Sequence, residues 1–187
     1  MKWTDLTKGR GDKGGTDFGI GKRLPKGHRV FQILGEIDML NAQIGMCETF
    51  QIHVNKLQEF NRKYMGYLHL GGKGSKILDE FLAYLDELLD YAVEQLESEF
   101  PYENSAKGWQ TYSNQWYVAT CQARKVERLL CLSWEERCRA TPTGLGKLIF
   151  PNMKESNKIL AIYNRMSKVL YCFGVLESTY ERLAENS

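Results

Sequence analysis

Apolar residues recur along most of the chain at the three- and four-residue spacing of an α-helix, and this pattern constrains the fold more than any other feature. The clearest stripe lies within residues 75–98, where one face is apolar and Asp and Glu residues fill the other. No segment of useful length alternates with the two-residue period of a strand. The sequence therefore predicts an all-α, five-helix bundle around one core, with antiparallel neighbours and helices at about 29–45, 48–69, 75–98, 112–132 and 153–184.

The breaks between these helices contain glycine and proline. Gly71 to Ser75 form one such break, and Ser75 is suited to cap the helix that follows. Residues 101–108 and 141–152 are predicted loops. The chain has 187 residues, of which 43% are hydrophobic, so we expect a single domain over 1–187 with a sizeable core.

A glycine- and lysine-rich loop precedes the helices. Residues 7–29 hold seven of the 17 glycines and seven of the 25 Lys and Arg residues, against only Asp12 and Asp17. Glycine lets backbone N–H groups approach a ligand closely, and the cations add positive charge, so we interpret this segment as a phosphate-binding loop. The alternative is a disordered basic tail. Four apolar anchors argue against that alternative: Phe18, Ile20, Leu24 and Val30.

Two common nucleotide motifs are incomplete in this chain. The spacing G-x-G-x-x-G within residues 9–14 would need a strand before it and a helix opening inside it, whereas residues 12–15 cannot open a helix. Residues 143–148 are similar to the end of a P-loop, but Thr141 stands at the first glycine position and Leu148 replaces the Mg²⁺-binding Ser or Thr. We therefore predict neither a Rossmann site nor a P-loop.

The charge is unevenly distributed. Residues 8–29 carry seven positive and two negative charges, whereas the rest carries eighteen and twenty-one, for a net charge of +2. A nucleic-acid-binding protein normally spreads its basic residues along a groove or a helix face. One concentrated basic loop instead indicates a small anionic ligand and no nucleic acid.

The remaining composition indicates where in the cell the protein is found and whether its side chains hold a metal ion. No signal peptide or membrane-spanning run is expected, since the first residues lack an apolar stretch. The five cysteines are odd in number and form no C-x-x-C pair, which is typical of reduced cysteines in a cytoplasmic protein. The three histidines lack metal-ligand spacing, so no protein-held metal is predicted. Of these three, only His28 in the loop is a candidate for function.

Four segments, taken in order, resemble one known family. They are Gly11 to Lys26, Leu34 to Gly45, Ala119 to Leu129 and Ile162 to Lys168. The chain is similar through these motifs to the PduO-type ATP:cob(I)alamin adenosyltransferases, which are trimeric five-helix bundles. The resemblance implies transfer of the 5′-deoxyadenosyl group of ATP to cob(I)alamin, with release of triphosphate. It also implies the substrates ATP, Mg²⁺ and a reduced corrinoid, and a homotrimer with sites between subunits. Candidate protein partners are a corrinoid reductase or a B12-dependent enzyme.

The resemblance assigns roles to particular residues. Catalytic roles in stabilising the charge of the leaving triphosphate and completing the site are expected for Arg124, Arg128 and Asp38. Nucleotide binding is expected for Lys8, Gly11, Asp12, Lys13, Gly14, Thr16, Arg23, Lys26, Glu127 and Asn164. Without the resemblance, the charged run at residues 124–128 is more typical of a solvated helix face than of a ligand site.

The chain departs from the family pattern at several positions. Arg10 and Met39 replace a threonine and a glutamate, and Lys168 replaces an aspartate. Thr120 replaces an arginine that ordinarily pairs with the position of Asp38 across a subunit boundary. We hypothesise that Lys168 takes over part of this ion pairing. These departures leave two alternatives open: a divergent relative that binds ATP or a corrinoid without transferring adenosyl, and a helical structural protein with a basic arm.

Overall fold

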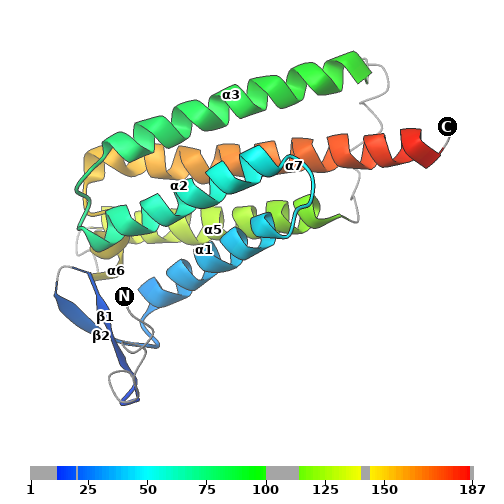
Figure 1. Cartoon of the computed structure of the whole chain (residues 1–187). Coiled ribbons are helices and arrows are strands. Elements are labelled where there is room, and N and C mark those ends of the chain that lie inside the picture. The colour runs from blue at the N-terminus through cyan, green and yellow to red at the C-terminus, as the bar shows by residue number, and fades with distance from the viewer. Residues whose placement is uncertain (1–11, 20, 100–113, 140–143, 186–187) are drawn as a thin grey trace.

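Five long helices form the body of the protein, which confirms the predicted five-helix bundle (Figure 1). The computed structural model describes residues 12–19, 21–99, 114–139 and 144–185. Within these ranges the long helices are α1 (Arg29–Gly45), α2 (Gln51–His69), α3 (Lys76–Glu99), α5 (Gln115–Cys138) and α7 (Ser156–Glu185). The fourth predicted helix thus begins three residues later than expected and continues six residues further.

Side-chain caps set where two of these helices begin. His28 precedes α1, and its Nδ1 accepts a hydrogen bond from the Val30 N–H at 3.2 Å. His28, which the sequence singled out as the histidine to consider for function, therefore caps a helix. Asn114 precedes α5 and accepts from the Tyr117 N–H at 3.0 Å. The same Asn114 amide donates to the Gly174 carbonyl at 2.8 Å, so the start of α5 is attached to α7.

Helix α7 lies at the centre of the bundle and packs against both α3 and α5. Its side chains Tyr163, Leu170 and Phe173 are fully buried, and each such burial contributes about 1.5–3 kcal/mol. Residues Met153–Tyr180 are long and apolar enough to cross a membrane by length and composition. Because 56% of the most apolar window is buried inside the protein, we interpret α7 as the core helix of the bundle.

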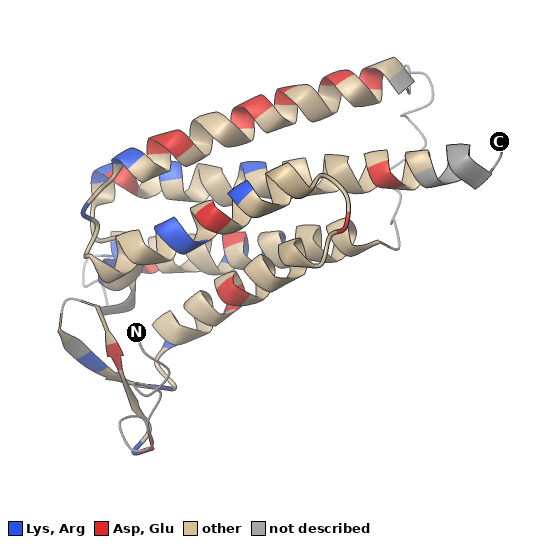
Figure 2. Cartoon of the chain, in the orientation of Figure 1, with Lys and Arg blue, Asp and Glu red and all other residues tan. Residues whose placement is uncertain are grey.

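Helix α3 shows the amphipathic pattern most clearly. Its residues Leu78, Phe81 and Leu85 are fully buried. Acidic side chains recur along the rest of the helix, as Figure 2 shows in red: Asp79, Glu80, Asp86, Glu87, Asp90, Glu94 and Glu97. The apolar stripe read from the sequence therefore does face the core.

The N-terminal loop contains a two-stranded antiparallel hairpin that the sequence did not predict. Strand β1 (Gly15–Phe18) pairs with β2 (Lys22–Pro25), so that Gly15 lies opposite Pro25 and Phe18 opposite Lys22. Gly21 has φ +75° in the connection, a left-handed conformation that favours glycine. Strands of four residues are too short to show a two-residue alternation, which is why the pattern was missed.

The segment 141–152, predicted as a loop, contains the short helix α6 (Gly144–Ile149), and this is a correction. Its last residue, Ile149, and the following Phe150 are buried, and α6 packs against α5. Proline and glycine dominate the local sequence signal here, but the burial of these apolar side chains favours a helical turn.

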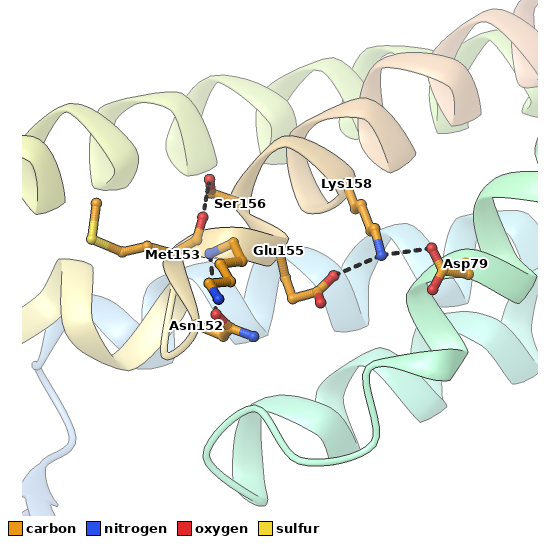
Figure 3. Close-up of polar contacts among 7 residues, drawn as sticks. Asp79, Asn152, Met153, Glu155, Ser156 and Lys158 are labelled. Carbon is orange, nitrogen blue, oxygen red and sulfur yellow. Dashed lines mark hydrogen bonds and ion pairs between the residues drawn. The ribbon is translucent and has the colours of Figure 1, made fainter.

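A 3₁₀ helix, Met153–Glu155, then leads into α7 through polar contacts shown in Figure 3. Asn152 Oδ1 accepts from the Lys154 N–H at 3.1 Å, and the Ser156 hydroxyl donates to the Met153 carbonyl at 2.7 Å. Lys158 Nζ lies 2.7 Å from Asp79 Oδ1 and 3.1 Å from Glu155 Oε2. These ion pairs join the beginning of α7 to the beginning of α3.

Candidate functional site

The predicted site residues of α5 lie on or beside its outward face. Arg124 is half-buried and Arg128, one helical turn further on, is exposed. The same outward face exposes apolar side chains at its two ends, with Val118 45% exposed and Leu132 50% exposed. This mixture of guanidinium and apolar groups on one face could bind an anion and also contact another surface.

Two of the predicted nucleotide-binding residues contact each other. The Asn164 side-chain amide of α7 donates to Glu127 Oε1 of α5 at 2.8 Å. The two residues belong to separate sequence motifs, 37 positions apart. The structure therefore joins the third and fourth motifs at one place on the surface, beside Arg124 and Arg128.

A polar network that the sequence did not predict joins α1 to α5. Glu36 Oε1 lies 2.8 Å from Lys125 Nζ, and Glu36 Oε2 accepts from the Gln122 amide at 2.7 Å. The same Gln122 amide also donates to the Glu36 carbonyl at 2.9 Å. The hydrogen bonds from Lys125 and from Gln122 lower the pKa of the Glu36 carboxyl below its usual value. Gln122 and Lys125 are three residues apart on one helix face, which is the only sequence signal for this network.

Thr120 faces the interior. Its side chain is fully buried, and its hydroxyl donates to the Trp116 carbonyl at 2.8 Å. Asp38 and Lys168 are both exposed, and within the part of one chain that the structure describes they form no ion pair with each other. A contact between Lys168 and Asp38 across subunits stays a prediction.

The hairpin presents its predicted ligand-binding residues at its open end. Asp12, Lys13, Gly14 and Lys26 are exposed. Gly14 has φ +74°, and a Cβ atom placed there would meet no other atom within 4 Å. The Lys26 N–H donates to the Gly14 carbonyl at 2.8 Å, so these two residues are held together. Within the described part of the chain these residues are exposed, and phosphate binding by this end of the hairpin stays a prediction.

Arg23 is engaged inside the hairpin. Its guanidinium donates to Asp17 Oδ1 at 3.0 Å and to the Gly15 carbonyl at 3.0 Å. It braces the two strands, and its contact with a nucleotide stays a prediction. Thr16 is half-buried on β1. Lys8 and Gly11 lie outside the described residues.

The two halves of the predicted site lie on different parts of one chain. The hairpin projects from one end of the bundle, near the beginning of α1, whereas Arg124 and Arg128 lie in the middle of α5 (Figure 1). The positively charged side chains available to an anionic ligand therefore lie on two separate surfaces of one chain.

Among the described residues, no group of three or more His, Cys, Asp or Glu side chains is arranged to hold a metal ion.

An open groove of about 400 Å³ lies elsewhere, between α2 and α3. It is lined by Lys56, Glu59, Phe60, Lys63, Glu80, Ala83, Tyr84 and Glu87. None of the predicted site residues lines it, so we do not assign it to the nucleotide.

Comparison with known proteins finds one protein family. A family model described as cobalamin adenosyltransferase matches residues 6–177. A search of curated proteins finds no match to the chain. The matched range includes the hairpin, α1, α5 and the part of α7 that carries Asn164.

Proposed function

The chain belongs to the cobalamin adenosyltransferase family, and from this we propose that it transfers the 5′-deoxyadenosyl group of ATP to a corrinoid in the Co(I) state. The Co(I) centre supplies an electron pair to the 5′ carbon of ATP and forms the cobalt–carbon bond. The carbon–oxygen bond breaks, and its electron pair leaves with the triphosphate. The substrates are MgATP and cob(I)alamin.

The observation that carries this proposal is the meeting of Glu127 and Asn164 beside Arg124 and Arg128. The triphosphate can leave without a strong general acid. Positive charge must, however, neutralise the negative charge that grows on the leaving oxygen. Guanidinium groups are suited to this role because they stay charged and bind phosphate oxygens in a bidentate manner. The Mg²⁺ that arrives with ATP shares the same charge.

The separation of the hairpin from the middle of α5 supports a site completed by a second subunit. We propose a homotrimer in which the hairpin of one subunit meets the outward face of α5 in its neighbour. The exposed apolar side chains Met39, Val118 and Leu132 favour such a contact, since a subunit interface would bury them. We place the protein in the cytoplasm, in keeping with its five free cysteines.

The test mixes the protein with MgATP and chemically reduced cobalamin and follows the absorbance of the Co(I) state. We expect this absorbance to disappear as triphosphate is released in equal amount. Persistence of the Co(I) spectrum with saturating MgATP, while a known adenosyltransferase clears it in parallel, would refute the enzymatic function.

The second candidate function is a relative that binds MgATP or a corrinoid without transfer. Thr120 favours this candidate. It carries no charge, it is buried with its hydroxyl bonded to the Trp116 carbonyl, and it therefore cannot supply the ion pair that the family pattern makes with the Asp38 position across a subunit boundary. MgATP at 100 times its Kd would then raise the free energy of unfolding by about 2.7 kcal/mol with no loss of Co(I) absorbance.

A further inference from the structure

We propose that His69, the last residue of α2, is a positioning residue that holds the N-terminal hairpin on the helical bundle. Its proposed effect on nucleotide binding rests on the proposed function, whereas its effect on the hairpin does not. Sequence patterns gave no reason to select His69, because it has no metal spacing and lies 50 residues from its contact in the hairpin.

The tip of the hairpin, formed by the end of β1 and the residue after it, contacts His69 in two ways. The Gly19 N–H donates a hydrogen bond to His69 Nδ1 at 3.3 Å. The Phe18 ring lies over the imidazole, with 5.2 Å between ring centroids and a tilt of 33°. Phe18 is only 1% exposed, and the ring of Phe31 on α1 meets it edge-on at 6.3 Å. The tip is therefore inserted between α1 and the end of α2.

The backbone at this contact leaves no room for a side chain on residue 19. A Cβ atom added to Gly19 would overlap the carbonyl group of His69. Glycine is therefore required for the hairpin to approach α2 this closely. Gly19 in the hairpin has no side chain to obstruct the approach, and His69 in α2 supplies the hydrogen-bond acceptor. Because the two residues are complementary, we regard the contact as a specific attachment.

His69 is exposed on the helix, so its imidazole contributes little to the core. The end of α2 is formed by the backbone and not by the His69 side chain. The Leu70 N–H donates to the Gly66 carbonyl at 3.0 Å, and Gly71 and Gly72 follow with positive φ. Replacing the His69 side chain should therefore leave α2 and the bundle folded. A residue that is dispensable for the bundle and yet bonded to the hairpin is suited to positioning.

Attachment at the tip is transmitted to the open end through the strands. The ladder pairs Phe18 with Lys22 at the tip and Gly15 with Pro25 at the other end. Arg23 braces the ladder through the Gly15 carbonyl. The rigid hairpin therefore ties the orientation of Gly14 and Lys26, at its open end, to the contact made by His69.

The experiment compares His69→Ala with His69→Asn, whose side-chain oxygen can accept the Gly19 N–H where Nδ1 does. Asn55→Ala is the matched control, an exposed position on α2 that lies ~21 Å along the helix from His69 at 1.5 Å per residue. Gly19→Ala is a second variant that breaks the contact from the hairpin side and leaves α2 unaltered. Each protein is first examined without nucleotide, by hydrogen–deuterium exchange over residues 15–25.

We expect His69→Ala and Gly19→Ala to speed exchange in the hairpin by ~5-fold or more, the loss expected for one hydrogen bond with its ring contact. Exchange in α3 and α7 should stay unchanged, and His69→Asn should restore much of the hairpin protection. In turnover, the KM for MgATP should rise by ~5-fold in the two released variants while kcat and the KM for the corrinoid stay near those of Asn55→Ala.

Unchanged hairpin exchange in both His69→Ala and Gly19→Ala would overturn the attachment. A released hairpin with an unchanged KM for MgATP would overturn the positioning role. If the unaltered protein shows no turnover at all, the proposed function fails, and the exchange measurements still decide whether His69 holds the hairpin.

Discussion

Removing the Glu36 carboxylate should loosen the contact between α1 and α5 by an amount that depends on pH. The perturbation is Glu36→Ala. Its ion pair with Lys125 joins side chains that are 18% and 48% exposed, and such a partly solvated pair contributes about 0.5–1 kcal/mol. The bond from the Gln122 amide is largely buried and goes to a charged acceptor, which adds about 1–1.5 kcal/mol.

The total expected loss at pH 7 is thus about 1.5–2.5 kcal/mol in the free energy of unfolding. Gln122 keeps its second bond to the backbone carbonyl of residue 36, so no buried amide is left without a partner. A loss of this size should lower the Tm by about 3–10 °C in a chain of this length.

The pH dependence identifies the charge as the source of this stability. The folded pKa of Glu36 is lowered, because the Lys125 and Gln122 bonds favour the ionised form. Its contribution is therefore complete above the unfolded value, near pH 4.5, and is lost as the pH falls through the lower folded value. Urea unfolding of the original protein and Glu36→Ala should show a difference at pH 7 that shrinks below pH 4.5.

Two results would contradict this account. A difference that is the same at pH 7 and in acid would mean that the carboxylate charge contributes nothing. A double-mutant cycle of Glu36→Gln with Lys125→Met that gives zero coupling would mean that the ion pair contributes nothing to the free energy of unfolding.

Three further predictions concern the site, the assembly and the response to pH. Arg128→Ala and Lys26→Ala should each cost about 2–4 kcal/mol in kcat/KM with little change in Tm, and unchanged turnover in both would exclude these residues from the site. Sedimentation should give the mass of a trimer, and a mass near the 21.6 kDa of one chain would contradict this prediction. A double-mutant cycle on Asp38 and Lys168 should show coupling between the two residues across subunits. Burial lowers the pKa of His53, so stability should fall as the pH drops below about 6.5, and His53→Gln should flatten that slope in urea unfolding.

The proposed function depends on side chains that a single subunit holds in place to different degrees. Glu127 is held by Asn164 within one chain. Arg128 is exposed, and the proposed trimer would provide its surroundings. The variants above therefore separate what one subunit does alone from what assembly adds.

The five long helices could be predicted from the sequence, because helical periodicity is a local signal that repeats every turn. Residues such as Leu78, Phe81 and Leu85 are buried where the stripe predicted. The grouping of charges in the loop and in α5 also belongs to the sequence alone, as does the family resemblance. Short elements escaped this reading, since β1, β2 and α6 have only four to six residues each and too few repeats to show a period.

Contacts between residues that are far apart in the chain could be found only in the folded structure. Glu36 reaches Gln122 over 86 positions, and Gly19 reaches His69 over 50. Such pairs depend on the rotation of each helix about its axis and on where the hairpin docks, and no local pattern encodes either. The burial of Thr120 is another result of this kind. The sequence shows only that an arginine of the family pattern is missing, whereas the packing of α5 turns that position into the core. A hydroxyl bonded to a helix carbonyl can be accommodated there, and an unpaired guanidinium cannot.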